Sequence, residues 1–187
     1  LMSICATPKL KEFLIKNHIQ GYGNTTYIIN GNLSTETMNP NNYGAIDAWT
    51  GHRATKAWYG LFNNGNLVDS PDDRAKLFFT TGHSYEMNDY KKWTDGYPSV
   101  KFTNKNFVGP TNATSFANTD FPLFRLSDAY LMYAECVVRG ASGGSAGLAL
   151  EYVNKVRTRS HALEINAGEL NLDFILKERG RELNLEG

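Results

Sequence analysis

Histidine and cysteine are the residue types most common in metal and redox sites, and in this chain they are too scattered to form one. The four histidines lie far apart and make neither an HxxxH nor an HExxH motif. Cys5 and Cys136 are too few and too widely separated for a zinc ribbon or a redox motif. We therefore expect no metal and no cofactor. Cys136 lies in a helical pattern and is expected to be reduced and buried. A disulfide between Cys5 and Cys136 is the alternative, and the sequence does not decide between the two.

Two carboxylates at a suitable separation are enough for glycoside hydrolysis, so the acidic residues need the same test. Asp72 and Asp73 follow Pro71 in a predicted turn, where neighbouring side chains diverge. Asp72 is better explained as a cap for the two residues that follow Asp73. A glycosidase that uses Asp72 or Asp73 with Glu86 therefore finds little support, and the chain is not expected to be an enzyme.

Three more carboxylates, Glu178, Glu182 and Glu186, repeat every four residues and share one face of a predicted helix. Arg179 and Arg181 lie close enough along the helix to form ion pairs with them. No Glu-x-x-His motif follows, so a di-iron carboxylate site is not predicted. This face is expected to be an ion-paired helix surface that packs against another element.

Aromatic side chains in polar loops are the remaining candidates for binding. Trp49 follows a polar run and is flanked by His52 and Arg53, while Trp93 and Tyr97 lie in the loop YKKWTDGY. Indole and phenol rings beside hydrogen-bonding groups suit a sugar, because its C–H face stacks on a ring while its hydroxyls are hydrogen-bonded. The alternative for each ring is that it anchors a long loop to the core. We take these five residues as candidate ligand-binding residues, with Trp49 first.

Composition narrows the class of protein further. The 187 residues include 19 basic and 19 acidic side chains, giving a formal net charge of +0, and 12% of them are aromatic. A nucleic-acid-binding protein normally carries a basic surplus, so nucleic acid is not an expected partner. No apolar run approaches the length of about 18 residues needed to span a bilayer.

Periodicity predicts mixed elements before residue 121 and helices after it. A helix is expected over 8–18, a strand over 25–29, a helix over 53–62 that buries Trp58 and Tyr59, and short strands over 77–81 and 99–102. Two antiparallel helices over 125–159, joined by the glycine-rich linker GASGGSAG, match the size of one tetratricopeptide hairpin. A third helix is expected over 172–185. One such hairpin cannot bury its apolar face alone, so it needs a partner surface.

Five segments carry a resemblance to a known family, and they occur in the expected order. They are TDFPLFRLSDAYLMYAE at 119–135, ALEYVNKVRTR at 149–159, ERGRELNLEG at 178–187, SPDDR at 70–74 and GYPSVKF at 96–102. Together they resemble the motifs of SusD/RagB-type proteins. The resemblance is strong from about residue 69 to the end of the chain.

The resemblance implies a fold, a function and a location. It implies a mainly α fold with irregular loops, a few short strands and a tetratricopeptide-like hairpin, of which this chain is an incomplete, C-terminal-side portion. It implies a surface-exposed lipoprotein of the outer membrane that captures an oligo- or polysaccharide without catalysis. The expected protein partner is a SusC-type TonB-dependent transporter, and the only expected membrane attachment is a lipid anchor upstream of this chain. Ligand residues vary within the family, so none is transferred by motif.

Two questions of organisation and function stay open at this stage. Residues 1–120 are expected to form a loop-rich, aromatic, ligand-binding portion and residues 121–187 a helical portion, both within one SusD-like domain. The alternative function is a helical scaffold that recognises a protein or peptide through the 125–159 hairpin, with the aromatic residues purely structural.

Overall fold

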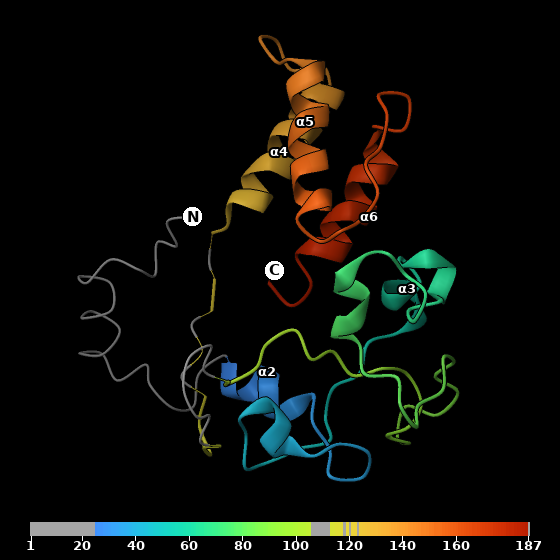
Figure 1. Ribbon diagram of the computed structural model, residues 1–187, viewed down its shortest axis with the longest axis vertical. Coiled ribbons are helices and arrows are strands. Elements are labelled where there is room, and N and C mark those ends of the chain that lie inside the picture. The colour runs from blue at the N-terminus through green and yellow to red at the C-terminus, as the bar shows by residue number, and fades with distance from the viewer. Residues whose placement is uncertain (1–24, 106–112, 118, 120, 123, 187) are drawn as a thin grey trace, which may run out of the picture. The chain divides into compact units, whose positions relative to one another are not determined.

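A computed structural model describes residues 25–105, 113–117, 119, 121–122 and 124–186. These residues fall into two compact units (Figure 1). The helical unit comprises residues 60–76 and 124–186, and the loop unit comprises residues 25–59 and the described part of 77–122. The helix expected over 8–18 lies outside the described residues. The division at residue 120 stays a prediction.

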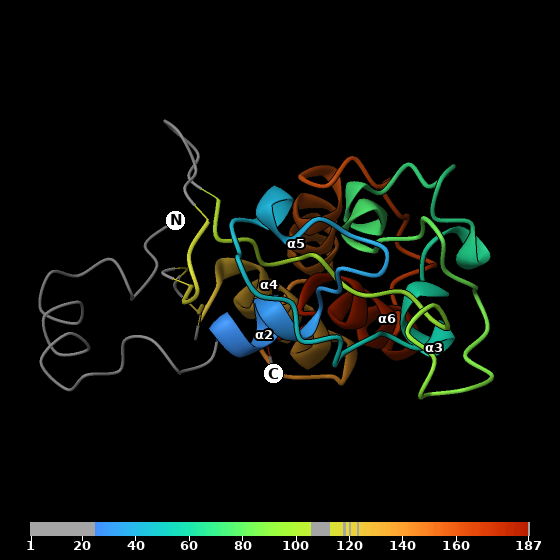
Figure 2. The same cartoon turned by 90° about the horizontal axis from the view of Figure 1, so that it is seen from below.

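Three helices form most of the helical unit: α4 (Leu126–Val138), α5 (Ala146–Thr158) and α6 (Leu172–Glu182). Helix α4 packs against both α5 and α6, and the three lie together in both views (Figures 1 and 2). The predicted hairpin and the third helix are therefore confirmed, and α6 supplies part of the partner surface that the hairpin needs. Segment 60–76 adds two short 3-10 helices, Asn63–Gly65 and Asp73–Leu77.

Local signals in the sequence fix the ends of these helices. Gly140 has φ +87, a left-handed conformation that suits a residue without a β-carbon and ends α4. The Ser145 side chain accepts a hydrogen bond from the backbone N–H of Leu148 and caps α5. Asn171 caps α6 in the same way through Phe174. The linker and both helix starts thus follow from ordinary capping chemistry.

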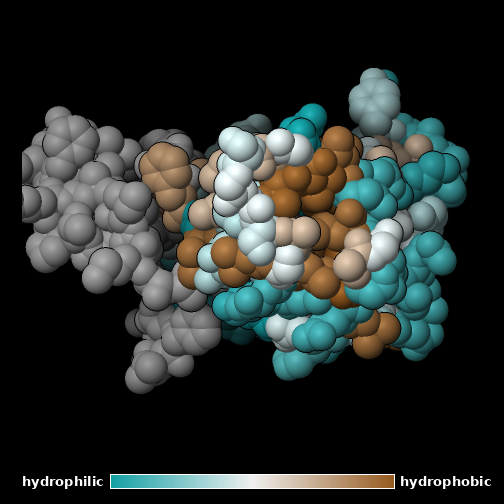
Figure 3. Space-filling view, turned by 90° about the horizontal axis from the view of Figure 1, so that it is seen from above, coloured by the Kyte–Doolittle hydropathy of each residue, from teal (hydrophilic) through white to brown (hydrophobic). Residues whose placement is uncertain are grey.

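Apolar residues at helical spacing form the core of this unit. The fully enclosed side chains come from all three helices and the α5–α6 connection: Leu131, Ala134, Ala149, Val153, Val156, Ile165 and Ile175. The rings of Tyr130 and Tyr152 stack beside them with centroids 4.2 Å apart. Several apolar side chains around this core are only partly buried, and Figure 3 shows hydrophobic surface gathered on one face of the molecule. Within the described residues no helix combines the length and apolar character needed to cross a membrane.

The loop unit has little regular structure in its described residues. It contains α2 (Thr25–Gly31), α3 (Lys56–Tyr59) and the 3-10 helix Pro40–Tyr43. Its core is built from four side chains of the segment 29–45 and one from a distant loop: Ile29, Leu33, Met38, Ala45 and Trp93. Where the structure describes this unit, its long connections are joined by single β-bridges and not by a sheet.

Three expectations about this unit need correction. The β-branched segment 25–29 is helical, because Thr25, Thr26, Ile29 and Asn30 are buried on one side of a helix while Tyr27 faces outward. Packing has overridden the strand propensity. The helix expected over 53–62 shortens to α3, although Tyr59 is fully buried as expected. No strand forms over 77–81 or 99–102, and the two segments are joined by a single antiparallel bridge between Phe78 and Ser99.

The core of the helical unit can be tested with two neighbouring residues of α4. Leu131 is fully buried, whereas Met132 is 47% exposed. We expect Leu131→Ala to lower the free energy of unfolding by about 2–5 kcal/mol, because it removes buried apolar surface and leaves a cavity. Met132→Ala is the matched control and is expected to change it by less than about 1 kcal/mol. Equal effects in guanidinium unfolding would contradict this packing.

Candidate functional site

Three exposed or half-buried rings of the loop unit lie together and form what we call the aromatic face: Tyr27, Trp49 and His52. Tyr27 is 57% exposed and Trp49 is 44% exposed. Their ring centroids are 6.1 Å apart, and the Tyr27 ring meets the His52 imidazole edge-on at 4.7 Å. Tyr27 was missed by the sequence analysis because its segment was taken as a strand. A helical period over 25–31 would have placed it on the outer side of α2.

The last carbonyls of α2 hold the loop that carries Trp49 and His52. The backbone N–H of Trp49 donates to the Asn30 carbonyl at 2.8 Å, and the N–H of His52 donates to the Gly31 carbonyl at 2.6 Å. The end of a helix leaves such carbonyls without partners inside the helix. The N–H groups of the loop provide these partners, and the hydrogen bonds fix the loop in place. A β-carbon on Gly31 would lie 2.5 Å from Nδ1 of His52, so this glycine lets the imidazole lie against the backbone.

Arg53 and Trp93 lie together in a second place within the loop unit. The Trp93 ring is only 3% exposed and belongs to the core, with its indole N–H donating to Oγ1 of Thr37 at 2.9 Å. The Arg53 guanidinium carbon is 5.4 Å from the centre of that ring, and its Nε donates to the Asp95 carbonyl at 2.8 Å. Trp93 therefore anchors its loop in this structure and offers little surface to a ligand.

Tyr97 lies in a third place, a cluster of tyrosines. Its ring centroid is 4.5 Å from that of Tyr59 and 6.3 Å from that of Tyr85. Burial, together with the neighbouring Tyr97 and Tyr85, raises the pKa of Tyr59 to about 12, and its hydroxyl donates to the Tyr85 carbonyl. Of the five candidate residues, the structure thus brings Trp49 and His52 together, pairs Arg53 with Trp93, and places Tyr97 elsewhere.

His83 links two loops of this unit and was not singled out by the sequence. Its Nε2 lies 3.0 Å from Oγ1 of Thr37, and its Nδ1 lies 2.8 Å from the Gly96 carbonyl. The imidazole also meets the Trp93 ring edge-on at 5.4 Å. Burial lowers the pKa of His83, and the positive charge of Arg53 acts in the same direction.

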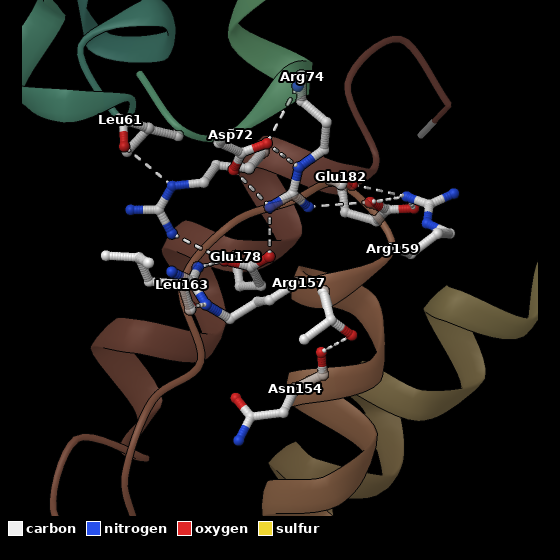
Figure 4. Close-up of polar contacts among 12 residues, drawn as sticks. Leu61, Asp72, Arg74, Asn154, Arg157, Arg159, Leu163, Glu178 and Glu182 are labelled. Carbon is white, nitrogen blue, oxygen red and sulfur yellow. Dashed lines mark hydrogen bonds and ion pairs between the residues drawn. The ribbon is translucent and has the colours of Figure 1, made fainter. Parts of the chain in front are cut away.

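The carboxylates of the helical unit form a buried ion network (Figure 4). Arg74 lies at its centre and donates to both oxygens of Asp72, at 2.9 and 2.7 Å. The same guanidinium reaches Glu178 at 2.7 Å and Glu182 at 2.9 Å. These four side chains are nearly or completely enclosed. Four further arginines surround the two α6 glutamates: Arg125, Arg157, Arg159 and Arg181.

The network confirms that the acidic face of α6 is ion-paired, but its burial and most of its partners differ from the expectation. Glu178 and Glu182 are ion-paired and pack against other elements, but they are buried instead of lying on the surface. Their partners come mostly from other segments, and Arg179 pairs with Asp128 on α4. Burial alone would raise the pKa of Glu182, but Arg159, Arg125 and Arg74 hold it below its ordinary value of 4.5. Glu182 is therefore held ionised and is unsuited to acid–base catalysis.

The other acidic candidates are also engaged. Asp72 forms an ion pair with Arg74. The two carboxylate oxygens of Asp73 lie 2.5 Å from Nζ of Lys76 and 2.5 Å from Nδ1 of His161. Glu86, in the loop unit, pairs with an exposed lysine. Among the residues that the structure describes, no group of three or more His, Cys, Asp or Glu side chains could hold a metal ion. The expectation that Cys136 is buried is wrong: this residue is exposed, because it lies on the outer side of α4.

Comparison with known proteins shows the family to which this chain belongs. A profile of the SusD family matches residues 76–187, which is more than half of the chain. The chain therefore belongs to the SusD family. The motifs that suggested the family all lie within or just before this match.

Two relatives show how much of such a protein this chain represents. The chain is 30% identical over 138 residues to the starch-binding protein SusD of Bacteroides thetaiotaomicron, a match that covers 72% of this chain and 24% of that protein. The crystal structure of a SusD superfamily protein from Bacteroides vulgatus matches 95% of this chain and 40% of its own, with a TM-score of 0.50 and 19% identity. This second match supports the fold alone. The chain spans about a quarter of the length of the curated relative.

The pH dependence of the loop unit tests the environment of His83. Because its pKa is lowered on folding, the neutral imidazole is favoured in the folded state, and this contribution is complete above the ordinary pKa of 6.5. It is lost as the pH falls from 6.5 through the lower pKa of the folded state. We expect His83→Gln to reduce the loss of stability between pH 7.5 and 5.5, measured by urea unfolding with tryptophan fluorescence. An unchanged pH dependence in the variant would contradict the burial of a neutral His83.

Proposed function

We propose that the protein containing this chain captures glycans at the cell surface without altering them chemically, and that the aromatic face is part of its ligand site. The observation that carries the proposal is the 30% identity to a starch-binding protein. The engagement of the carboxylates of Glu178 and Glu182 by arginines supports a binding role over a hydrolytic one.

The aromatic face has the physical properties that sugar binding requires. Tyr27 and Trp49 expose ring surface at an interplanar angle of 57°, so a bent oligosaccharide can stack on both. The His52 imidazole beside them supplies a nitrogen for hydrogen bonding to a hydroxyl. The chain is neutral overall, which suits a neutral sugar better than an anionic one. Arg53 and Trp93, which pair in a second place, and Tyr97, in the tyrosine cluster, are proposed to stabilise the loops of the unit that carries this surface.

Delivery of the glycan to a transporter is a further part of the proposal. Membership of the SusD family supports a location at the outer membrane and a SusC-type TonB-dependent transporter as the protein partner. The membrane attachment would be a lipid anchor in a part of the protein upstream of this chain.

A second candidate function rests on the surface of the predicted hairpin. Leu126 and Met132 on α4 are exposed, as is common for surfaces that bind peptides or proteins. In this reading the hairpin is a scaffold for a protein partner, and the aromatic face is structural. Binding of a protein partner that survives the loss of Trp49, together with no glycan binding, would favour this alternative.

Calorimetry of the full-length protein with a panel of oligosaccharides that includes maltoheptaose tests the proposed ligand site. Trp49→Ala and Tyr27→Ala should each weaken binding by about tenfold, equivalent to about 1.4 kcal/mol, because each removes a stacking ring. Gly31→Ala should also weaken it, since the added β-carbon displaces His52.

The control for this experiment is Tyr90→Ala, which removes an exposed ring of the same loop unit outside the aromatic face. Its binding should equal that of the unchanged protein. Full affinity in the Trp49 and Tyr27 variants would contradict the site, whereas absence of binding to every glycan in the panel would contradict the function.

A further inference from the structure

Arg157 and Arg181 share a single carboxylate in the buried ion network. Nη1 of Arg157 lies 2.7 Å from Oε2 of Glu178, and Nη1 of Arg181 lies 3.0 Å from the same oxygen. The other oxygen of Glu178 accepts from Arg74 at 2.7 Å. One negative charge therefore serves three guanidinium groups.

The buried ion network carries more positive than negative charge, and the excess lies near Glu178. Among the described residues, five arginines (Arg74, Arg125, Arg157, Arg159 and Arg181) face four carboxylates (Asp72, Glu178, Glu182 and Glu186), which leaves one positive charge in excess within this set. The charges of Arg125 and Arg159 are balanced by Glu182 and Glu186. The charge of Arg74 is balanced by Asp72, which pairs with no other arginine of the network. The surplus accordingly lies on Arg157 and Arg181.

The two guanidinium groups are fixed in place, and each keeps an unused donor. Nε of Arg157 donates to the Leu163 carbonyl at 2.6 Å, and Nε of Arg181 donates to the Leu61 carbonyl at 2.9 Å. Their central carbons lie 5.2 and 5.9 Å from the centre of the same Phe174 ring. Neither Nη2 has a hydrogen-bond partner among the described residues, and the side chains are 13% and 15% exposed, so solvent still reaches them.

Electrostatics around Arg181 agree with an uncompensated charge. Desolvation lowers the pKa of Arg181, and Arg157 and Arg74 lower it further, against the opposing effect of Glu178. An additional anion at this point would relieve the repulsion between the two guanidinium groups.

We propose that Arg157 and Arg181 form a docking site for one carboxylate, carried by an aspartate or glutamate of a protein partner. The two guanidinium groups lie close together because both bind the same oxygen of Glu178. A carboxylate has two oxygens, each of which can accept from one of them, and such charge-assisted hydrogen bonds are among the stronger ones. The neighbouring Leu163 side chain is 70% exposed, which offers an apolar contact to the residue beside that acid. A protein segment with an acidic residue flanked by apolar ones fits this combination.

Saturation-transfer NMR on the full-length protein provides the test, with acetyl-Leu-Glu-Leu-amide as the probe. We expect saturable binding of this peptide and at least about tenfold weaker binding of the Leu-Gln-Leu analogue, because only the former supplies the carboxylate. Equal binding of the two peptides, or tighter binding of glucuronate or acetate than of the acidic peptide, would overturn the proposal.

Leu163 lies at the exposed rim, so variants of it leave the buried network unchanged. Leu163→Asp places a carboxylate beside the site and should abolish binding of the acidic peptide, whereas Leu163→Asn should leave most of it. Arg157→Gln should weaken binding at least about tenfold, and Arg139→Gln, which alters an exposed arginine paired with Glu135, should not. Undiminished binding by either Leu163→Asp or a folded Arg157→Gln protein would contradict the site.

Discussion

Two buried glutamates on one helix face determine how the helical unit is built. Glu178 and Glu182 are almost completely removed from solvent, and a buried carboxylate is tolerated only when it is paired and hydrogen-bonded. Arg74 meets this requirement from a segment more than 100 positions earlier in the chain. Arginines from the start of α4 and the end of α5 meet the rest. The turn at 72–74, the start of α4 and the end of α5 must therefore converge on α6.

The loop unit depends on a smaller constraint of the same kind, the satisfaction of backbone polar groups. With few helices and only single β-bridges among its described residues, it holds its loops by hydrogen bonds to helix ends and to buried side chains. The carbonyls of Asn30 and Gly31 fix the loop that presents Trp49 and His52. Thr37 joins the indole of Trp93 to the imidazole of His83. The first pair of contacts fixes the aromatic face, and the Thr37 contacts fix the loops around Trp93.

Sequence patterns predicted what depends on local periodicity and missed what depends on distant partners. Helices α4, α5 and α6 follow from apolar spacing and caps, and the ion-paired face of α6 follows from its glutamates. The identity of the pairing arginines could not be read locally, because Arg74 lies far from α6 in the chain. Residues 25–29 were misassigned since five β-branched and aromatic residues look the same in a short helix and a strand. Burial of Trp93 was hidden because its loop is polar in composition.

The central claim, that the buried ion network organises the helical unit, is tested most directly by removing the charge shared by three arginines. Glu178→Gln should lower the free energy of unfolding by about 3–5 kcal/mol, as expected when one partner of a buried ion pair is lost. Glu151→Gln, which removes an exposed i,i+4 pair with Lys155, should cost less than about 1 kcal/mol. Equal and small losses for both variants in urea unfolding would contradict the claim.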